Sequence, residues 1–181
     1  MDNASLGLIH IYCGDGKGKS TAGIGLAIRA LGHDIPVVFA QFSKKDTSGE
    51  IKILKNISGI TVLHSRKNFG FYKNMSEADK IEARQFYTDL LEETLQTAVE
   101  KALAGGTLLI LDEIISTIQN QLVDEEYLID FMKNKPGNLE VVLTGRNPGD
   151  KLLSIADYVS EINKVKHPFD RGIRARRGIE K

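Results

Sequence analysis

Short apolar segments alternate with helix-like segments along most of the chain, and this alternation limits the folds that the chain can adopt. The apolar segments are rich in Ile, Val and Leu, as is typical of strands covered on both faces of a parallel sheet. We expect strands at residues 8–12, 37–41, 60–64, 107–111, 139–143 and 158–162. We expect helices at residues 19–31, 76–104, 124–133 and 149–156. The pattern predicts an α/β fold with a mostly parallel central sheet and flanking helices, but it does not determine the strand order.

The longest expected helix has recognisable start and stop signals. Ser76 and Asp79 have the spacing of a capping box, and Gly105 and Gly106 follow the helix. Its apolar residues recur with helical spacing, so we interpret them as core packing. They are Phe86, Leu90, Leu91, Leu95, Ala98, Val99, Ala102 and Leu103.

Composition narrows the class of protein further. The chain has 181 residues, and its 24 Lys and Arg balance 24 Asp and Glu. We therefore expect one soluble globular domain, residues 1–181, without bulk electrostatic binding of nucleic acid. No apolar run approaches the ~20 residues that span a bilayer, and no secretion signal is evident, so no membrane association is expected. A single cysteine excludes an internal disulfide, which fits a cytoplasmic location.

Basic residues gather at the end of the chain. Residues 164–181 contain seven Lys or Arg and two acidic residues. Pro168, Gly172 and Gly178 interrupt this segment, so we expect an irregular tail that belongs to the same domain. By itself such a segment is typical of a solvated face, and we do not expect it to bind nucleic acid.

A glycine-rich sequence follows the first expected strand and opens the first expected helix. Residues 13–21 read Cys-Gly-Asp-Gly-Lys-Gly-Lys-Ser-Thr, which is the context of a P-loop. Its glycines let backbone N–H groups surround phosphate oxygens, Lys19 would neutralise phosphate charge, and the Ser20 hydroxyl would hold Mg²⁺. The usual pattern is G-x-x-x-x-G-K-[ST]. In this chain Cys13 occupies the position of its first glycine, and the glycine follows one residue later, as Gly14. The alternative is a glycine-rich turn without a ligand, and we interpret Cys13 as a packing residue, not a nucleophile.

Two carboxylates follow the fourth expected strand. Asp112 and Glu113 end an apolar run, where nucleotide-binding proteins of this kind place an acid beside Mg²⁺. Glu113 could act as a base or as a second metal partner. Many strands end in a solvated acid, so the prediction depends on the P-loop. Together the two elements predict binding of a Mg²⁺–nucleotide complex.

Further segments point to one family. Residues 41–44 read Gln-Phe-Ser-Lys, residues 144–148 read Thr-Gly-Arg-Asn-Pro, and residues 166–180 read KHPFDRGIRARRGIE. With the shifted loop, this series resembles the P-loop-type ATP:corrinoid, or cob(I)alamin, adenosyltransferases over residues 7–180. That family's loop has the same displaced first glycine, and generic P-loop ATPases lack the terminal motif.

The resemblance implies a fold, a reaction and a set of residues. The implied fold is the recombinase-like branch of P-loop NTPases, and the implied reaction transfers the 5′-deoxyadenosyl group of ATP to a cobalt(I) corrinoid. Implied partners are a second copy of the chain and, as electron donor, a reduced flavoprotein; Mg²⁺ is the implied cofactor, with Mn²⁺ as a substitute. Implied ATP-binding residues are Gly14, Asp15, Gly16, Lys17, Gly18, Lys19, Ser20, Thr21 and Arg146, and implied metal ligands are Ser20, Asp112 and Glu113.

The same resemblance assigns the corrinoid side of the site. Phe69 and Phe71 correspond to aromatic residues that crowd the lower face of the corrin, and with Lys19 they are the expected catalytic residues. His167, Arg171 and Arg174 are the other expected corrinoid contacts. Relatives often have Trp at the second aromatic position, whereas this chain contains no Trp, and some have a longer N-terminal segment. Without the resemblance, Phe69 and Phe71 are equally well explained as loop anchors.

Two other functions remain open from the sequence. One is a P-loop ATPase or nucleotide kinase with an unrelated substrate, which Asp112 and Glu113 would also suit. The other is a regulator that binds ATP or a corrinoid without catalysis. The sequence does not distinguish complete cobalamin from an earlier corrinoid intermediate.

Overall fold

Six parallel strands form the centre of the protein. The computed structural model describes residues 6–43, 48–65, 67, 69–70 and 72–180. The strands are β1 (Ile9–Cys13), β2 (Val37–Gln41), β3 (Ile60–His64), β4 (Thr107–Asp112), β5 (Leu139–Thr144) and β6 (Tyr158–Glu161). Their order in the sheet is β3-β2-β4-β5-β1-β6, and every neighbouring pair is parallel. The predicted α/β class and parallel sheet are confirmed.

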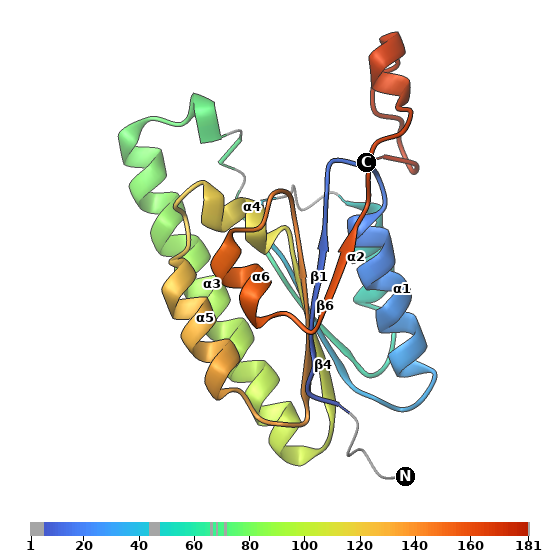
Figure 1. Ribbon diagram of the computed structural model, residues 1–181, viewed down its shortest axis with the longest axis vertical. Helices are drawn as coiled ribbons and strands as arrows, with labels where there is room; N and C mark the ends of the chain where they lie inside the picture. The colour runs from blue at the N-terminus through green and yellow to red at the C-terminus, as the bar shows by residue number, and fades with distance from the viewer. Residues whose placement is uncertain (1–5, 44–47, 66, 68, 71, 181) are drawn as a thin grey trace.

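Helices cover both faces of this sheet (Figure 1). They are α1 (Lys19–Leu31), α2 (Gly49–Leu54), α3 (Glu77–Ala104), α4 (Ile114–Gln119), α5 (Glu125–Asn134) and α6 (Asp150–Ile155), with 3₁₀ turns at Tyr72–Asn74 and Pro168–Arg171. One hydrophobic cluster lies under α1 and α2, and a larger one lies under the other helices. The sequence did not predict α2 and α4, which have six residues each. Within the described residues, no helix is both long and apolar enough to cross a membrane.

The predicted capping box starts α3. The Ser76 hydroxyl accepts a hydrogen bond from the Asp79 backbone N–H at 3.1 Å, and the Asp79 carboxylate accepts one from the Ser76 backbone at the same distance. Most of the expected apolar stripe is buried against the sheet. Leu103 is an exception, since it is 78% exposed on the last turn, so its assignment to the core was wrong.

Position in the sheet decides how much of each strand is covered. Every residue of the central strand β4 is buried. β6 lies at one edge, and Tyr158 and Val159 are about half exposed, at 52% and 50%. The expectation that all strands are covered on both faces was therefore wrong for β6. Beyond β6 the chain continues past the carboxyl ends of the strands, where Figure 1 shows the C-terminal segment.

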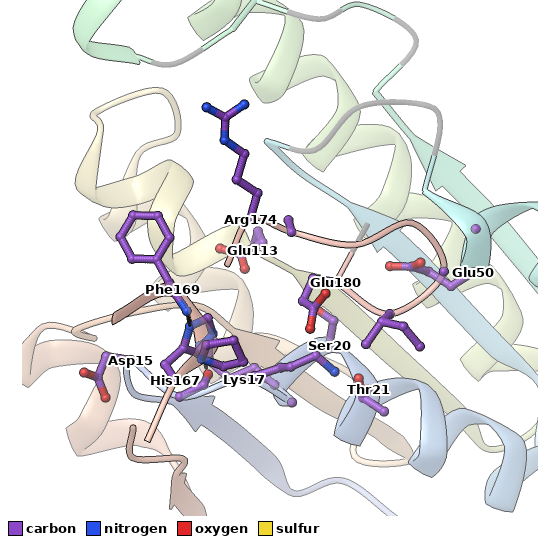
Figure 2. A pocket seen from close by; sticks show the side chains of 18 of the residues that line it. Asp15, Lys17, Ser20, Thr21, Glu50, Glu113, His167, Phe169, Arg174 and Glu180 are labelled. Carbon is purple, nitrogen blue, oxygen red and sulfur yellow. Dashed lines mark hydrogen bonds between the residues drawn. The ribbon is translucent and has the colours of Figure 1, made fainter. Parts of the chain in front are cut away.

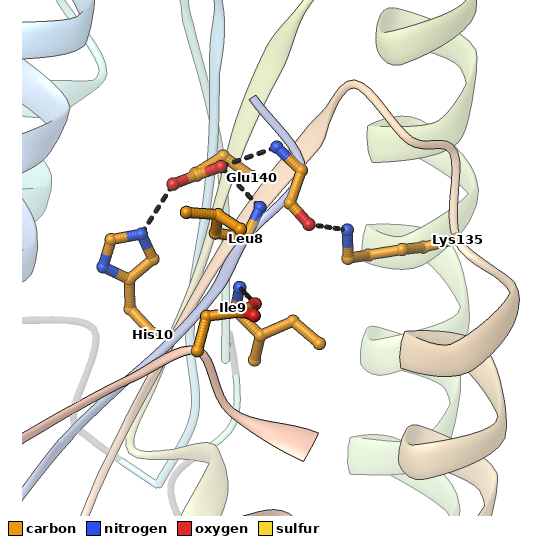
Figure 3. Close-up of polar contacts among 7 residues, drawn as sticks. Leu8, Ile9, His10, Lys135 and Glu140 are labelled. Carbon is orange, nitrogen blue, oxygen red and sulfur yellow. Dashed lines mark hydrogen bonds and ion pairs between the residues drawn. The ribbon is translucent and has the colours of Figure 1, made fainter. Parts of the chain in front are cut away.

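A carboxylate from β5 holds the beginning of β1 (Figure 3). One oxygen of Glu140 accepts hydrogen bonds from the backbone N–H groups of Gly7 and Leu8 at 2.6 and 2.7 Å. The other oxygen lies 2.6 Å from His10 Nε2, and the His10 ring stacks on Tyr158 at 4.6 Å between centroids. His10 is thus a packed histidine, as the sequence indicated, with a carboxylate partner. These contacts fix the strand that leads into the glycine-rich loop.

Candidate nucleotide-binding site

The glycine-rich loop turns between β1 and α1 with the backbone that its glycines allow. Gly14 and Gly18 have φ values of 101° and 126°, in the region that favours glycine. The chain after β6 crosses directly behind the loop, where the Gly16 N–H donates to the Ile162 carbonyl at 2.7 Å. A Cβ atom would lie 2.5 Å from that carbonyl oxygen at Gly14 and 2.6 Å from it at Gly16. The crossing segment therefore explains why these two positions require glycine.

Lys19 lies across this loop at the start of α1. Its side chain is 7% exposed, and its ammonium donates to the Gly16 carbonyl at 2.8 Å. Ser20 and Thr21 occupy the same first helical turn and border the adjoining pocket. The first turn of a helix also presents unpaired N–H groups and the positive end of the helix dipole. The arrangement can bind an anion such as a nucleotide phosphate.

A pocket of about 620 Å³ lies over the loop (Figure 2). Its lining combines the loop and first turn of α1, the starts of α2 and α4, the turn after β5 and the C-terminal segment. Predicted site residues that line it are Asp15, Gly16, Lys17, Gly18, Lys19, Ser20, Thr21, Glu113, Arg146, His167 and Arg174. Residues far apart in the sequence thus meet at the carboxyl ends of the strands, where ligands bind in open α/β sheets.

Four other predicted residues lie outside this lining. Gly14 contacts the segment after β6, Asp112 is fully buried, and Arg171 lies in the exposed 3₁₀ turn. Phe69 packs against Phe86 and Tyr87 beside α3, with ring centroids 5.7 and 5.9 Å away. Phe71 lies outside the described residues. The assignment of roles to all these residues stays a prediction.

Sequence reasoning missed several residues of the pocket. They are Ile24, Gly49, Glu50, Pro168, Phe169, Ile173, Ala175, Gly178, Ile179 and Glu180. Those after residue 167 belong to the terminal motif, so that motif could have indicated them. Gly49 and Glu50 begin α2, which carried no recognisable signal.

Asp112 and Glu113 have different environments. Asp112 is buried at the end of β4, where its oxygens accept hydrogen bonds from Gln41 Nε2 at 3.1 Å and Thr144 Oγ1 at 2.7 Å. Glu113 has a left-handed backbone, φ 64°, and its carboxylate accepts from the Ser116 hydroxyl at 2.7 Å beside the pocket. Strand β5 separates β4 from the P-loop strand β1.

Oxygen donors at the end of β4 and in the first turn of α1 suit a hard cation. The Ser20 hydroxyl and the carboxylates of Asp112 and Glu113 are ligand types that Mg²⁺ accepts, directly or through water. Among the described residues, no group of three or more His, Cys, Asp or Glu side chains forms a protein-only metal cage. Mg²⁺ usually binds through one or two carboxylates with substrate phosphates and water, so the donor set fits that ion.

The C-terminal segment forms one wall of the pocket through specific polar contacts. The Lys164 backbone N–H donates to the Asp15 carboxylate at 2.9 Å, and this bond lowers the pKa of Asp15. Further along, Arg176 Nη2 donates to Glu180 Oε1 at 2.8 Å, and its backbone N–H donates to Oε2 at 2.8 Å. These contacts with Arg176 lower the pKa of Glu180 to about 2. The predicted irregular tail is thus an ordered part of the site.

Cys13 ends β1 just before the loop. Its side chain is buried, and burial raises the pKa of the thiol, with a smaller contribution from Glu161. A thiol with a raised pKa is a poor nucleophile. The interpretation of Cys13 as a packing residue agrees with this environment.

A P-loop on a parallel sheet defines a nucleotide-binding protein of the P-loop class. The structure is similar to EssC (ATPases 2 and 3) from Geobacillus thermodenitrificans, with a TM-score of 0.55 and 12% sequence identity. The likeness covers 97% of this chain and 35% of that chain, and it supports the fold alone.

Sequence comparison identifies the family. The model of the family ATP:corrinoid adenosyltransferase BtuR/CobO/CobP matches residues 5–180. A corrinoid adenosyltransferase of Sinorhizobium sp is 32% identical over 177 residues, covering 96% of this chain and 80% of that protein. A corrinoid adenosyltransferase of Escherichia coli strain K12 is 30% identical over 176 residues, covering 96% and 85%. The chain belongs to the ATP:corrinoid adenosyltransferase family.

Proposed function

We propose that this protein transfers the 5′-deoxyadenosyl group of ATP to the cobalt(I) centre of a corrinoid and releases triphosphate. The observation that carries the proposal is the pocket that is lined jointly by Lys17, Lys19, the glycine-rich loop and the C-terminal segment. Membership of the family supplies the reaction and the second substrate. The product would serve adenosylcobalamin synthesis or salvage.

The reaction makes particular demands on the protein. Cobalt(I) carries no proton, so its attack on the 5′ carbon of ATP needs no general base. The site must instead place the two substrates in line and stabilise the negative charge that grows on the leaving triphosphate. The negative charge on the triphosphate would be stabilised by Lys17, Lys19 and the N–H groups of the loop. Ser20, Asp112 and Glu113 would hold Mg²⁺, which would neutralise further phosphate charge when bound.

The remaining parts of the proposal rest on the family. We propose Mg²⁺ as the physiological cation with Mn²⁺ as a substitute, a homodimer in the cytoplasm, and a reduced flavoprotein as electron donor. His167 and Arg174 line the same pocket as the loop, which supports their role as substrate contacts. Arg146, also in that lining, is proposed to contact the nucleotide.

One anaerobic assay tests the proposed reaction. The protein is mixed with ATP, Mg²⁺ and chemically reduced cob(I)alamin, and a light-sensitive cobalt–carbon product is followed by absorbance. Intact triphosphate in equimolar amount with that product is the expected result. ADP and orthophosphate would instead indicate an ATPase, a phosphorylated acceptor would indicate a kinase, and ATP binding without product would indicate a regulator. Lys19→Met is the matched negative control.

Reduction of cobalt(II) provides a separate test of the aromatic residues. A corrinoid without its lower axial ligand accepts an electron more readily, and apolar side chains against that face would displace the ligand. Replacement of Phe69 and Phe71 together by Ala should therefore impair turnover from cobalt(II) much more than turnover from prereduced cobalt(I). Equal losses in the two assays would indicate that both residues only anchor the loop. The packing of Phe69 on Phe86 is consistent with that simpler role.

A further inference from the structure

A chain of side-chain hydrogen bonds joins the carboxyl ends of three neighbouring strands. Gln41, the last residue of β2, lies beside Asp112 of β4 in the parallel register and is 2% exposed. Its amide Nε2 donates to Asp112 Oδ2 at 3.1 Å. From the opposite side, the buried Thr144 hydroxyl of β5 donates to Asp112 Oδ1 at 2.7 Å. Each oxygen of the Asp112 carboxylate therefore accepts a hydrogen bond from a neutral donor on a neighbouring strand.

The other end of this chain reaches the wall of the nucleotide pocket. The Ser48 hydroxyl donates to Gln41 Oε1 at 2.7 Å. Ser48 is the residue before α2, and the next two residues, Gly49 and Glu50, line the pocket. Both ends of the Gln41 amide are consequently used, and its orientation is fixed: the oxygen faces Ser48 and the nitrogen faces Asp112.

An amide has the chemistry that this position requires. It offers a donor to one neighbour and an acceptor to the other, while adding no charge beside the buried carboxylate. A carboxylate in its place would set two like charges side by side and would offer Asp112 no donor. Because the Gln41 amide contacts one carboxylate oxygen directly, it helps to set the direction in which the Asp112 carboxylate faces.

We propose that Gln41 is a positioning residue that sets the orientation of Asp112 toward the divalent cation of the ATP complex. Through Ser48 it couples that carboxylate to the pocket wall formed by the start of α2. The inference rests on the proposed function only in assigning Asp112 to the cation. Partners that orient metal ligands typically contribute 10–100-fold to metal affinity.

The test measures metal binding without turnover. Mn²⁺ is titrated into the full-length protein with ATP and no corrinoid, and free Mn²⁺ is followed by electron paramagnetic resonance. Gln41→Met, which keeps the length of the side chain but removes both polar groups, should weaken Mn²⁺ binding about tenfold or more. Binding of ATP without metal should not change, and in the adenosylation assay kcat should fall while KM for the corrinoid stays constant.

Two further variants separate positioning from general damage. Thr107→Val removes a buried hydroxyl at the opposite end of β4 and should leave Mn²⁺ affinity unchanged. Ser48→Ala removes the hydrogen bond from Ser48 to Gln41 at a half-buried position. This variant tests the coupling even if Gln41→Met fails to fold. It should weaken Mn²⁺ binding by a smaller factor than Gln41→Met does. Wild-type Mn²⁺ affinity in Gln41→Met, or in Ser48→Ala if the first variant does not fold, would overturn the proposal.

The outcome is independent of the proposed reaction. A wild-type protein that binds Mn²⁺–ATP but forms no cobalt–carbon bond would refute the adenosyltransferase reaction, and the Gln41 effect on Mn²⁺ would still be measurable. A wild-type protein that forms the product, with Mn²⁺ affinity insensitive to Gln41, would refute the positioning role alone.

Discussion

Removal of the Glu140 carboxylate should destabilise the protein at the base of the P-loop strand. Glu140→Ala deletes the acceptor for Gly7 N, Leu8 N and His10 Nε2, which lie 2.6–2.7 Å from its oxygens. Hydrogen bonds to a charged group contribute about 1.5–3 kcal/mol each when their partners lose them in a buried site. Leu8 is 37% exposed, so its N–H can bind water instead. The Gly7 and His10 contacts are only partly buried, so we expect a total loss of about 2–4 kcal/mol, below the full value for two buried bonds.

The assay is urea unfolding followed by far-ultraviolet circular dichroism. For a chain of 181 residues, each kcal/mol corresponds to roughly 2–4 °C in Tm, so the loss should also appear as a Tm lower by about 4–16 °C. Glu140→Gln keeps one acceptor oxygen, so its free energy of unfolding should lie between those of the wild type and Glu140→Ala. Glu92→Ala, on the exposed side of α3, is the control and should stay within about 0.5 kcal/mol of wild type. If Glu140→Ala also stayed within that range, the carboxylate would not anchor β1.

Three further predictions concern the site and its supporting strand. Triphosphate at about 100 times its Kd should stabilise the wild type by about 2.7 kcal/mol, which a thermal-shift assay records as an increase in Tm. Lys19→Met removes the ammonium bonded to the Gly16 carbonyl and should lose most of that increase in Tm. An unchanged increase in the variant would refute the role of Lys19. Thr107→Val should raise the free energy of unfolding by about 1 kcal/mol, because the Thr107 hydroxyl is buried without a hydrogen-bond partner among the described residues. A free energy of unfolding below that of the wild type, measured in urea, would contradict this reasoning. The Arg176 contacts lower the pKa of Glu180 from 4.5 to about 2. Their stabilisation of the C-terminal segment should therefore be complete above pH 4.5 and be lost as the pH falls toward 2. The carbon-13 shift of the Glu180 carboxyl measures this titration, and a midpoint near pH 4.5 would exclude the ion pair.

Local signals explain what the sequence could predict. The loop around Lys19 and the cap at Ser76 depend on residues that are close in sequence, and both have the expected structure. Apolar strand segments also have a local pattern. The strand order has none, and neither does the exposure of Tyr158 in β6, because both depend on which segments pack together in space.

The candidate site shows the same division. Lys17 and Ser20 were predictable because the P-loop is one continuous motif. Glu50 lines the pocket because α2 begins beside it, and six-residue α2 carries no periodic signal. The support of Asp112 by Gln41 depends on two strands being neighbours, which a single sequence does not reveal.

The close crossing of Ile162 behind Gly14 and Gly16 ties the two ends of the chain together. A larger residue at either glycine would push against a backbone carbonyl, and that carbonyl belongs to the strand end from which the C-terminal segment departs. A side chain could therefore arise at either of these two positions only together with a shift of the segment that follows β6.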